Sequence, residues 1–257
     1  YHTSPNCNLE MSITLESEIK HKSAFFAENG IILEGQAPIY VAPPYYSCEV
    51  PVVYEKGQGI RFAIGLYVQT NGGNVYQQAD KLFINTPNDV YIYVSGVTDF
   101  KQKELFFSKR NCMMENIQHI QYEKQKKAHM DVYANYFDRM HLDINYTPDN
   151  ELALKMFHYA RYLMICSSVP GSQCTNLQGI WNAELVPPWF SDYTININTE
   201  MNYWQTGPCN LEEMGEPLVR LCEEMAADGK ETAMHYFGKE GVCSFHNTDL
   251  WLSLIHI

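Results

Sequence analysis

Positive charge is scarce in this sequence. Its 257 residues include 18 Lys and Arg against 30 Asp and Glu, a formal net charge of −12. Proteins that follow a nucleic-acid backbone need clustered basic residues, so this balance excludes nucleic acid as a partner. Long apolar runs are also missing: the longest, such as 62–68 and 162–166, fall far short of the roughly 18 residues that cross a bilayer. We therefore expect no membrane span.

The cysteines form no recognisable motif. All eight are scattered, with no CxxC pair and no paired His spacing, which argues against a zinc site or a thioredoxin-like redox motif. They are also too few for a disulfide scaffold in a chain of this length. We expect scattered buried thiols and neither a metal nor an organic cofactor.

What the sequence does contain is apolar and aromatic. Hydrophobic residues make up 46% and aromatic residues 13%, which excludes a disordered chain. At about 150 residues per domain, the length allows one large domain or two ordinary ones.

The first hundred residues have the pattern of β-strands. Residues 9–16 alternate between apolar and polar side chains, as in a strand with one buried face. Turn-forming Gly, Pro and Asn residues separate further β-like runs at 30–34, 47–54, 60–68, 81–85 and 90–94. Short strands without intervening helices predict an all-β region over 1–98, arranged as an antiparallel sandwich.

The second half has helical patterns. Residues 113–140 show apolar side chains at 3-and-4 spacing around a polar stretch, 123–127, which we interpret as a solvated helix face. Thr147 and Pro148 predict a helix start, with an apolar face continuing to about residue 165. Asn210, with Glu213 three residues later, resembles a capping box of a helix that ends at Gly229, and 231–238 is typical of a short further helix.

Between the two clear helices, residues 167–209 mix amides with Trp and Tyr. Long structured loops in a helical domain are usually functional. Amides donate to and accept from hydroxyls, and flat rings cover the apolar face of a sugar, so the region suits a neutral polyhydroxylated ligand. The alternative is that Trp181, Trp189 and Trp204 are core residues and the Asn residues cap helices.

Several polar residues near this loop are candidates for chemistry. Asn196 and Asn198, if extended, would point the same way. The nearest carboxylates are Asp192, Glu200 and Asp249, and glycoside hydrolysis normally needs an acid and a base. Glu200 is equally consistent with a helix-surface carboxylate, and His246 with a structural histidine.

The ordered motifs in this region resemble glycoside hydrolase family 95, the α-L-fucosidases. They are NLQGIWN (176–182), PPW…SDYTININ (187–198), MNYW (201–204), NLEE…EPL (210–218) and HNTDLW (246–251), preceded by a weaker match through GVTDF (96–100). The resemblance implies a multidomain β-then-α protein. Its expected parts are the end of an N-terminal β-sandwich domain (1–100), a helical linker (101–146), the first part of an (α/α)6 barrel (147–251) and a short tail (252–257).

The resemblance also implies an activity. It predicts inverting release of terminal α-1,2-linked L-fucose from fucosylated glycans, without metal or cofactor, and by analogy a secreted or periplasmic location. An α-L-galactosidase on the same fold stays open, because apolar pockets reject an added hydroxyl poorly. A non-catalytic glycan-binding protein is a further alternative.

The resemblance carries roles onto particular residues. Asn196 and Asn198 match catalytic positions that hold the attacking water, since an amide is a very poor base. We expect the substrate to contact Trp181, Thr194, His246, Asp249 and Trp251. Family members often have His at the positions of Thr194 and Phe245, and a small or polar residue at that of Phe190, which leaves subsite preference in doubt.

Both termini suggest a piece of a longer protein. No initiator Met or signal segment opens the chain, and residues 252–257 can be back-translated into an adapter used in DNA library preparation. We interpret this tail as non-native, the alternative being a natural strand cut short. By motif order, the family's acid Glu and water-activating Asp lie beyond Trp251, so we expect the chain alone to be inactive.

Overall fold

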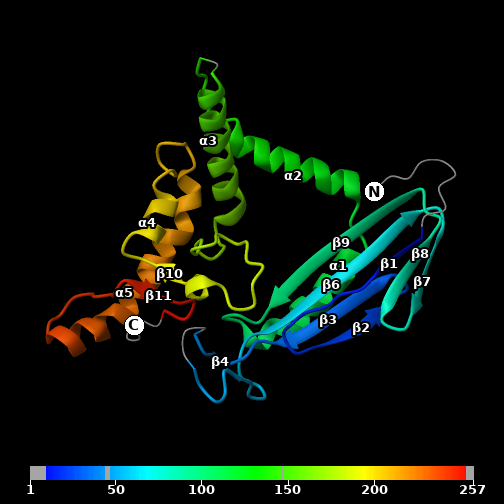
Figure 1. Cartoon of the computed structure of the whole chain (residues 1–257), viewed down its shortest axis with the longest axis horizontal. Coiled ribbons are helices and arrows are strands. Elements are labelled where there is room, and N and C mark those ends of the chain that lie inside the picture. Colours follow the sequence, from blue (N-terminus) through cyan, green and yellow to red (C-terminus); the bar gives the residue numbers. More distant parts are fainter. Residues whose placement is uncertain (1–9, 44–46, 146, 253–257) are drawn as a thin grey trace. The chain divides into compact units, whose positions relative to one another are not determined.

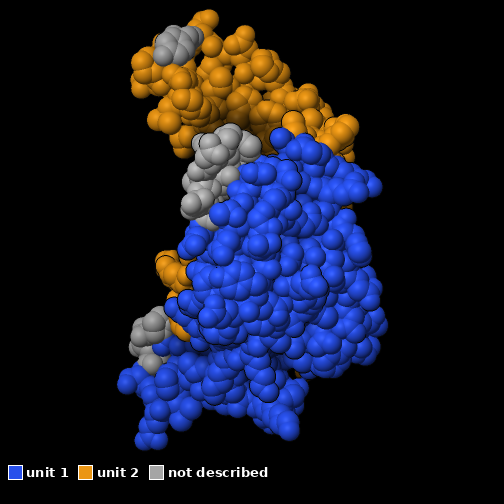
Figure 2. All heavy atoms as spheres, turned by 90° about the vertical axis from the view of Figure 1, so that its right-hand side faces the viewer, with its two compact units in different colours: residues 1–126 blue, residues 127–257 orange. Residues whose placement is uncertain are grey.

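The computed structural model describes residues 10–43, 47–145 and 147–252. The chain divides into two compact units, residues 1–126 and residues 127–257 (Figure 2). Strands form the first unit together with one helix, and helices dominate the second (Figure 1). This confirms the predicted change from β to α along the chain.

The first unit is built on a four-stranded antiparallel sheet with the order β2-β3-β6-β9. Its strands are β2 (His21–Phe26), β3 (Gly30–Gln36), β6 (Arg61–Asn71) and β9 (Asp89–Thr98). In the register, Ile31 lies opposite Leu66 and Ile32 opposite Gly65. Because side chains alternate along a strand, Ile31 and Ile32 enter different cores on the two faces of the sheet.

A second, three-stranded sheet covers one of these faces. It consists of β1 (Glu10–Ile13), β8 (Lys81–Asn85) and β7 (Asn74–Gln78), in the order β1-β8-β7. Both sheets contribute to a single core of Ile31, Leu66, Val68, Leu82, Ile84 and Val90. The predicted antiparallel sandwich is therefore confirmed. A separate pair, β4 (Tyr40–Val41) and β5 (Val52–Val53), is much shorter than the predicted strand over 47–54.

Helix α1 (Phe106–Ile117) covers the other face of the four-stranded sheet, after a 3-10 turn η1 (Lys103–Leu105). Phe106 and Met113 pack there against Ile32 and Ala63. A Cβ at Gly65 would lie 3.1 Å from the Met113 methyl carbon, so the small residue allows the helix to approach the sheet closely.

The predicted helical segment 113–140 consists of two helices, because the chain breaks between α1 and α2 (Tyr122–Phe137). The polar stretch 123–127 is exposed on α2, as predicted for a solvated face. The strands β2, β4 and β7 were not predicted, because none of them has a clear apolar alternation.

In the second unit, α3 (Pro148–Ser167) begins where the sequence predicts. The Thr147 hydroxyl accepts the Asn150 N–H at 3.1 Å, and Pro148 is the first helical residue. Proline suits this position because its missing N–H would have no helical partner.

The predicted bounds of the next helix are wrong. The region begins with a 3-10 turn, η3 (Glu212–Gly215), and α5 (Glu216–Phe237) runs through Gly229 and is capped by Gly238. Asn210 has φ 54° and makes no cap, and the predicted helix over 231–238 is the last part of α5. Gly229 serves packing instead, because a Cβ there would lie 2.8 Å from Val242.

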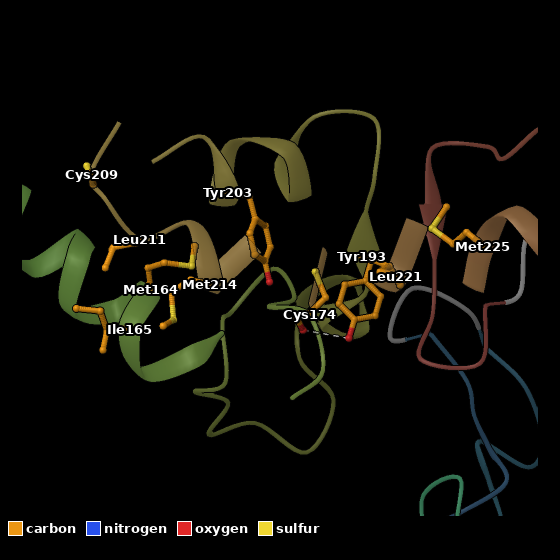
Figure 3. Packing of buried hydrophobic residues seen from close by; sticks show 10 residues of the cluster. All are labelled: Met164, Ile165, Cys174, Tyr193, Tyr203, Cys209, Leu211, Met214, Leu221 and Met225. Carbon is orange, nitrogen blue, oxygen red and sulfur yellow. Dashed lines mark hydrogen bonds between the residues drawn. The ribbon is translucent and has the colours of Figure 1, made fainter. Parts of the chain in front are cut away.

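The core of the second unit joins α3, α5 and the segments between them (Figure 3). Short elements complete it: η2 (Pro188–Ser191), β10 (Tyr193–Thr194), α4 (Asn198–Tyr203) and β11 (Asn247–Thr248). The core residues are Met164, Ile165, Cys174, Tyr193, Tyr203, Cys209, Leu211, Met214, Leu221 and Met225. The predicted all-α unit thus also contains one short strand pair.

The described cysteines are free thiols, but they are not uniformly buried. Cys174 and Cys209 are buried, whereas Cys112 and Cys222 are exposed. Across the described ranges, no helix is both long and apolar enough to cross a membrane. Residues 253–257 of the predicted adapter tail lie outside the described residues.

Candidate functional site

A buried tyrosine fixes the loop that follows α3. The Ser168 hydroxyl donates to the Met214 carbonyl at 2.7 Å, so its second contact, 2.7 Å from the Tyr203 hydroxyl, is one in which Tyr203 donates. Tyr203 in turn accepts the Thr175 N–H at 2.9 Å. Burial raises the pKa of Tyr203 to about 12, which keeps its proton available for this network.

The strand pair β10–β11 brings together two predicted site segments that are distant in sequence. Thr194 lies opposite Asn247, and the Ile195 N–H donates to the His246 carbonyl at 2.8 Å. Thr194 and His246 therefore lie side by side, as members of one site must.

A pocket of about 260 Å³ lies beside this pair, and we call it the Asn198 pocket. Its lining consists of Leu177, Trp189, Thr194, Asn198, His246 and Asn247. Two amides and a hydroxyl can donate to and accept from a ligand, and Leu177 and Trp189 provide apolar walls. No Lys or Arg lines it, so the pocket offers nothing to hold an anion.

The two predicted catalytic asparagines are placed differently. The extended conformation expected for 196–198 is wrong: the chain turns after β10, and α4 begins at Asn198. Asn198 lines the pocket, whereas Asn196 is exposed in the turn and is not among the lining residues. The cause is local, because a turn followed by a helix rotates alternate side chains away from a common face.

A second pocket of about 420 Å³ contains Trp181, and we call it the Trp181 pocket. Leu177 lines both pockets, so they adjoin across the loop that carries it. Trp181, Trp189 and Trp204 are 46%, 74% and 61% exposed. The alternative that these three are core residues is therefore wrong.

The structure does not bring the two remaining predicted contacts into either pocket. The Asp249 carboxylate accepts the Trp251 N–H at 2.8 Å, and the Asp249 carbonyl accepts the Leu252 N–H at 3.1 Å. These bonds form a turn directly after β11. Neither Asp249 nor Trp251 is among the residues that line the two pockets.

Asp192 is the carboxylate most affected by this region. Burial raises its pKa, and the charge of Asp249 raises it further, while a hydrogen bond from the Thr194 hydroxyl at 3.3 Å and the charge of His246 lower it. Asp192 is thus electrostatically linked to three predicted site residues. Glu200, by contrast, is exposed on α4, as expected of a helix-surface carboxylate.

Comparison with known proteins assigns this region. Residues 144–255 match the model of the glycosyl hydrolase family 95 catalytic domain. Three curated relatives are α-fucosidases by name, and one of them aligns with 95% of this chain.

The second unit is similar to the catalytic domain of glycosyl hydrolase family 95.

The proteins that this chain resembles are a plant protein and two fungal proteins. Alpha-L-fucosidase 2 of Arabidopsis thaliana is 27% identical over 282 aligned positions, and the chain covers 33% of its length. Probable alpha-fucosidase A of Aspergillus niger is 44% identical over 84 residues, which are 32% of this chain and 11% of the relative. Its counterpart in Aspergillus oryzae is 35% identical over 94 residues, or 36% and 13% of the two chains. The chain therefore spans a third or less of each.

Three residues that line the Asn198 pocket were not expected as substrate contacts from the sequence: Leu177, Trp189 and Asn247. The sequence could have indicated Trp189 as a contact, because it follows two prolines in a long loop. Trp189, Phe190 and Ser191 have φ of 50°, 53° and 51°, a left-handed run that is costly for residues other than glycine and is typical of functional loops. Leu177 and Asn247 lie within the motifs NLQGIWN and HNTDLW, but only the fold shows that they reach the pocket.

The described residues offer no donor set for a metal. Within them, no group of three or more His, Cys, Asp or Glu side chains is placed to hold an ion. The arrangement presents neutral donors, one imidazole and apolar walls.

Proposed function

We propose that this chain forms part of an α-L-fucosidase that releases terminal α-1,2-linked L-fucose from glycans with inversion of configuration. The observation that carries the proposal is the lining of the Asn198 pocket, where neutral hydrogen-bonding groups meet apolar walls in a family 95 catalytic region. The names of the three relatives support the choice of fucose.

The charge of the second unit favours a neutral substrate. Residues 127–257 include 7 Lys and Arg against 17 Asp and Glu. An anionic ligand would be repelled by this field and would find no basic side chain in either pocket. A 6-deoxy sugar instead offers hydroxyls to the amides and a methyl group to Leu177 or Trp189.

The proposed chemistry separates water placement from proton transfer. An inverting glycosidase needs an acid and a base about 6.5–9.5 Å apart, with room for a water molecule. We propose that Asn198 positions this water through its amide and that carboxylates outside residues 1–251 act as acid and base. The described helices would then belong to an (α/α)6 barrel, joined to the sandwich (1–100) by a linker (101–146).

The decisive experiment measures fucose release by the full-length protein. It should release fucose from 2′-fucosyllactose faster than from 3-fucosyllactose, with β-L-fucose appearing first by NMR. Nitrophenyl α-L-galactoside tests the galactosidase alternative. Absence of turnover with all fucosides, together with saturable fucose binding, would establish the glycan-binding alternative instead.

Variants test the pocket itself. Asn198→Ala should lower kcat by at least about a hundredfold, because water placement is part of the transition state. Asn135→Ala, an exposed amide on α2, is the matched control and should retain activity. Equal activity of Asn198→Ala and wild type would exclude the proposed role. The 257-residue chain alone should release no fucose above a buffer control.

A further inference from the structure

A third pocket, of about 360 Å³, lies in the first unit, and we call it the Lys22 pocket. Its walls are residues 20–22 at the start of β2, residues 34–36 at the end of β3, Arg61 at the start of β6 and the first two residues of α1. All of these residues belong to one compact unit. The volume lies within the range of pockets that hold small molecules.

The register of the sheet brings the polar walls of this pocket together. Lys22 lies opposite Glu34 in the pairing of β2 with β3. Gln36 lies opposite Arg61 in the pairing of β3 with β6. Opposite residues of an antiparallel pair share a face, and so do residues two apart on one strand. The four side chains therefore lie on the face that also carries Ile32, where α1 packs.

The negative charges beside the pocket are already neutralised by arginines. Among the described residues that line the pocket, only Glu34 is a carboxylate, and it accepts a hydrogen bond from Arg110 at 2.7 Å. Arg61 donates through Nε to Asp99 at 2.8 Å. Lys22 consequently has no ion-pair partner in the part of the chain that the structure describes, although Glu34 is its neighbour across the strands.

A second lysine at the pocket is held in place without losing its charge. The Lys20 Nζ lies 4.3 Å from the centroid of the Tyr54 ring, a cation–π contact that orders the ammonium group but does not neutralise it. A Cβ at Gly35 would lie 2.7 Å from the Lys20 carbonyl oxygen, so this glycine allows the residue before β2 to approach β3 closely. Two lysines thus leave the pocket positive in a chain whose net charge is −12.

The remaining wall combines a guanidinium group with an exposed ring. Arg61 donates through Nη2 to the Lys103 carbonyl at 2.6 Å, whereas its Nη1 makes no hydrogen bond within the described residues. The Cζ atoms of Arg61 and Arg110 each lie 5.2 Å from the centroid of the Phe107 ring. Because Phe107 is 55% exposed, its ring retains open surface for an apolar part of a ligand. No acidic residue occurs in the first turn of α1, so the positive end of the helix adds to the field of the lysines.

We propose that the Lys22 pocket binds an acidic sugar, a pyranose that carries a sulfate ester or a carboxylate. Its anionic group would accept charge-assisted hydrogen bonds from Lys20, Lys22 and the free Nη1 of Arg61. The C–H face of its ring would lie on Phe107. The two pockets of the second unit have no basic side chain in their described lining, so the Lys22 pocket adds recognition of a different class of sugar. This inference is independent of the proposed fucosidase activity.

The test uses three sugars that differ only at C6: galactose, galacturonic acid and galactose 6-sulfate. We expect titration of the full-length protein at low salt, followed by ligand-detected NMR, to show saturable binding of at least one of the two acidic sugars. Galactose should not bind at the same concentrations. The acid that binds more tightly identifies the anionic group, and added salt should weaken its binding because the lysines are screened.

Variants locate the binding in the Lys22 pocket. Lys22→Met removes the charge and keeps an unbranched side chain, so it should weaken binding of the acidic sugar by at least about fivefold. Phe107→Ala removes the exposed ring and should weaken it by about threefold or more. Lys81→Met, at an exposed lysine of β8 outside the pocket, is the matched control and should bind like the wild type.

Several results would overturn the proposed site. They are the absence of saturable binding of both acids, equal binding of galactose, and affinity that Lys22→Met leaves unchanged. Inorganic sulfate or acetate that binds as tightly as the corresponding acidic sugar would also overturn it, because the pocket would then hold an anion without recognising a sugar. None of these outcomes depends on fucose release, so the proposed function is tested separately.

Discussion

The two units satisfy their buried polar groups in different ways. In the first, two sheets pair most backbone groups in regular ladders, and the one buried polar or charged side chain among its described residues is Asp99. In the second, seven are buried: Arg161, Ser167, Ser168, Thr175, Thr199, Thr232 and Thr248. Two of them, Arg161 and Ser168, donate to backbone carbonyls of other segments, which have no ladder partners.

Both pockets of the proposed site are lined by loops and helices of the second unit. The first unit has a pocket as well, the Lys22 pocket of about 360 Å³, beside β2, β3 and β6. The units also differ in charge, with 11 Lys and Arg against 13 Asp and Glu in residues 1–126, and 7 against 17 in residues 127–257. Regular backbone thus stabilises the first unit, whereas a few polar side chains organise the second.

The largest expected effect comes from Arg161. Its guanidinium is fully buried and donates to the carbonyls of Phe137 at 2.9 Å, Tyr136 at 3.1 Å and Met140 at 3.3 Å. These carbonyls lie at and after the end of α2. Arg161→Met leaves them buried without a donor and should lower the free energy of unfolding by about 3–5 kcal/mol.

Hydrogen exchange would show whether this effect is confined to one unit. Amides of α3 should lose protection in Arg161→Met, and those of β3 and β6 should keep it. Arg110→Met is the control, since the guanidinium of that arginine is partly exposed and binds the side chains of Glu34, at 2.7 Å, and Asn111. Equal loss of protection in both units would refute their independence.

Leu82→Ala tests the first unit in the same way. Leu82 is fully buried between the two sheets, so its truncation leaves a cavity and should cost about 3 kcal/mol. Urea unfolding should measure this loss, and hydrogen exchange should show lower protection of the amides in β1, β7 and β8. Leu105→Ala, which truncates a 45% exposed leucine, should change stability by less than about 1 kcal/mol. An equal loss of amide protection in α3 and α5 would contradict the separate stability of the two units.

The sequence predicted features that depend on neighbouring residues better than features that depend on distant ones. Alternation predicted the central strands, and Thr147 predicted the start of α3, because both signals are local. Gly229 misled the prediction of α5, since its cause is the close approach of Val242, which lies far along the chain.

The candidate site depends even more on contacts between residues that are distant in sequence. Thr194 and His246, both expected from the motifs to contact the substrate, come together through pairing across about fifty residues. The turn that separates Asn196 from Asn198 was not predicted, because the pattern of residues 194–198 fits a strand equally well. Leu177 joins the two pockets only in three dimensions.

Tyr203→Phe should have a smaller effect than either core variant. It removes the hydroxyl that binds Ser168 and the Thr175 N–H, leaving a buried donor without its partner. We expect a loss of about 1–2 kcal/mol in urea unfolding. Tyr159→Phe, at a tyrosine 60% exposed on α3, is the control. A loss in Tyr203→Phe no larger than in this control would show that apolar packing alone organises the second unit.

The smallest expected effect concerns pH and the carboxyl of Asp192. Burial raises its pKa in the folded state, so folding favours the protonated form. As the pH rises from the unfolded pKa of about 3.9, the unfolded chain loses this proton first, and stability falls until the folded pKa is passed. Asp192→Asn should therefore raise the melting temperature at pH 7 relative to wild type, and the gain should vanish near pH 3.

Asp131→Asn, at an exposed carboxylate paired with Lys127, should show no such gain. A lower melting temperature of Asp192→Asn at pH 7 would instead mean that the His246 and Thr194 contacts outweigh burial, and that this loop, too, is held by a polar side chain.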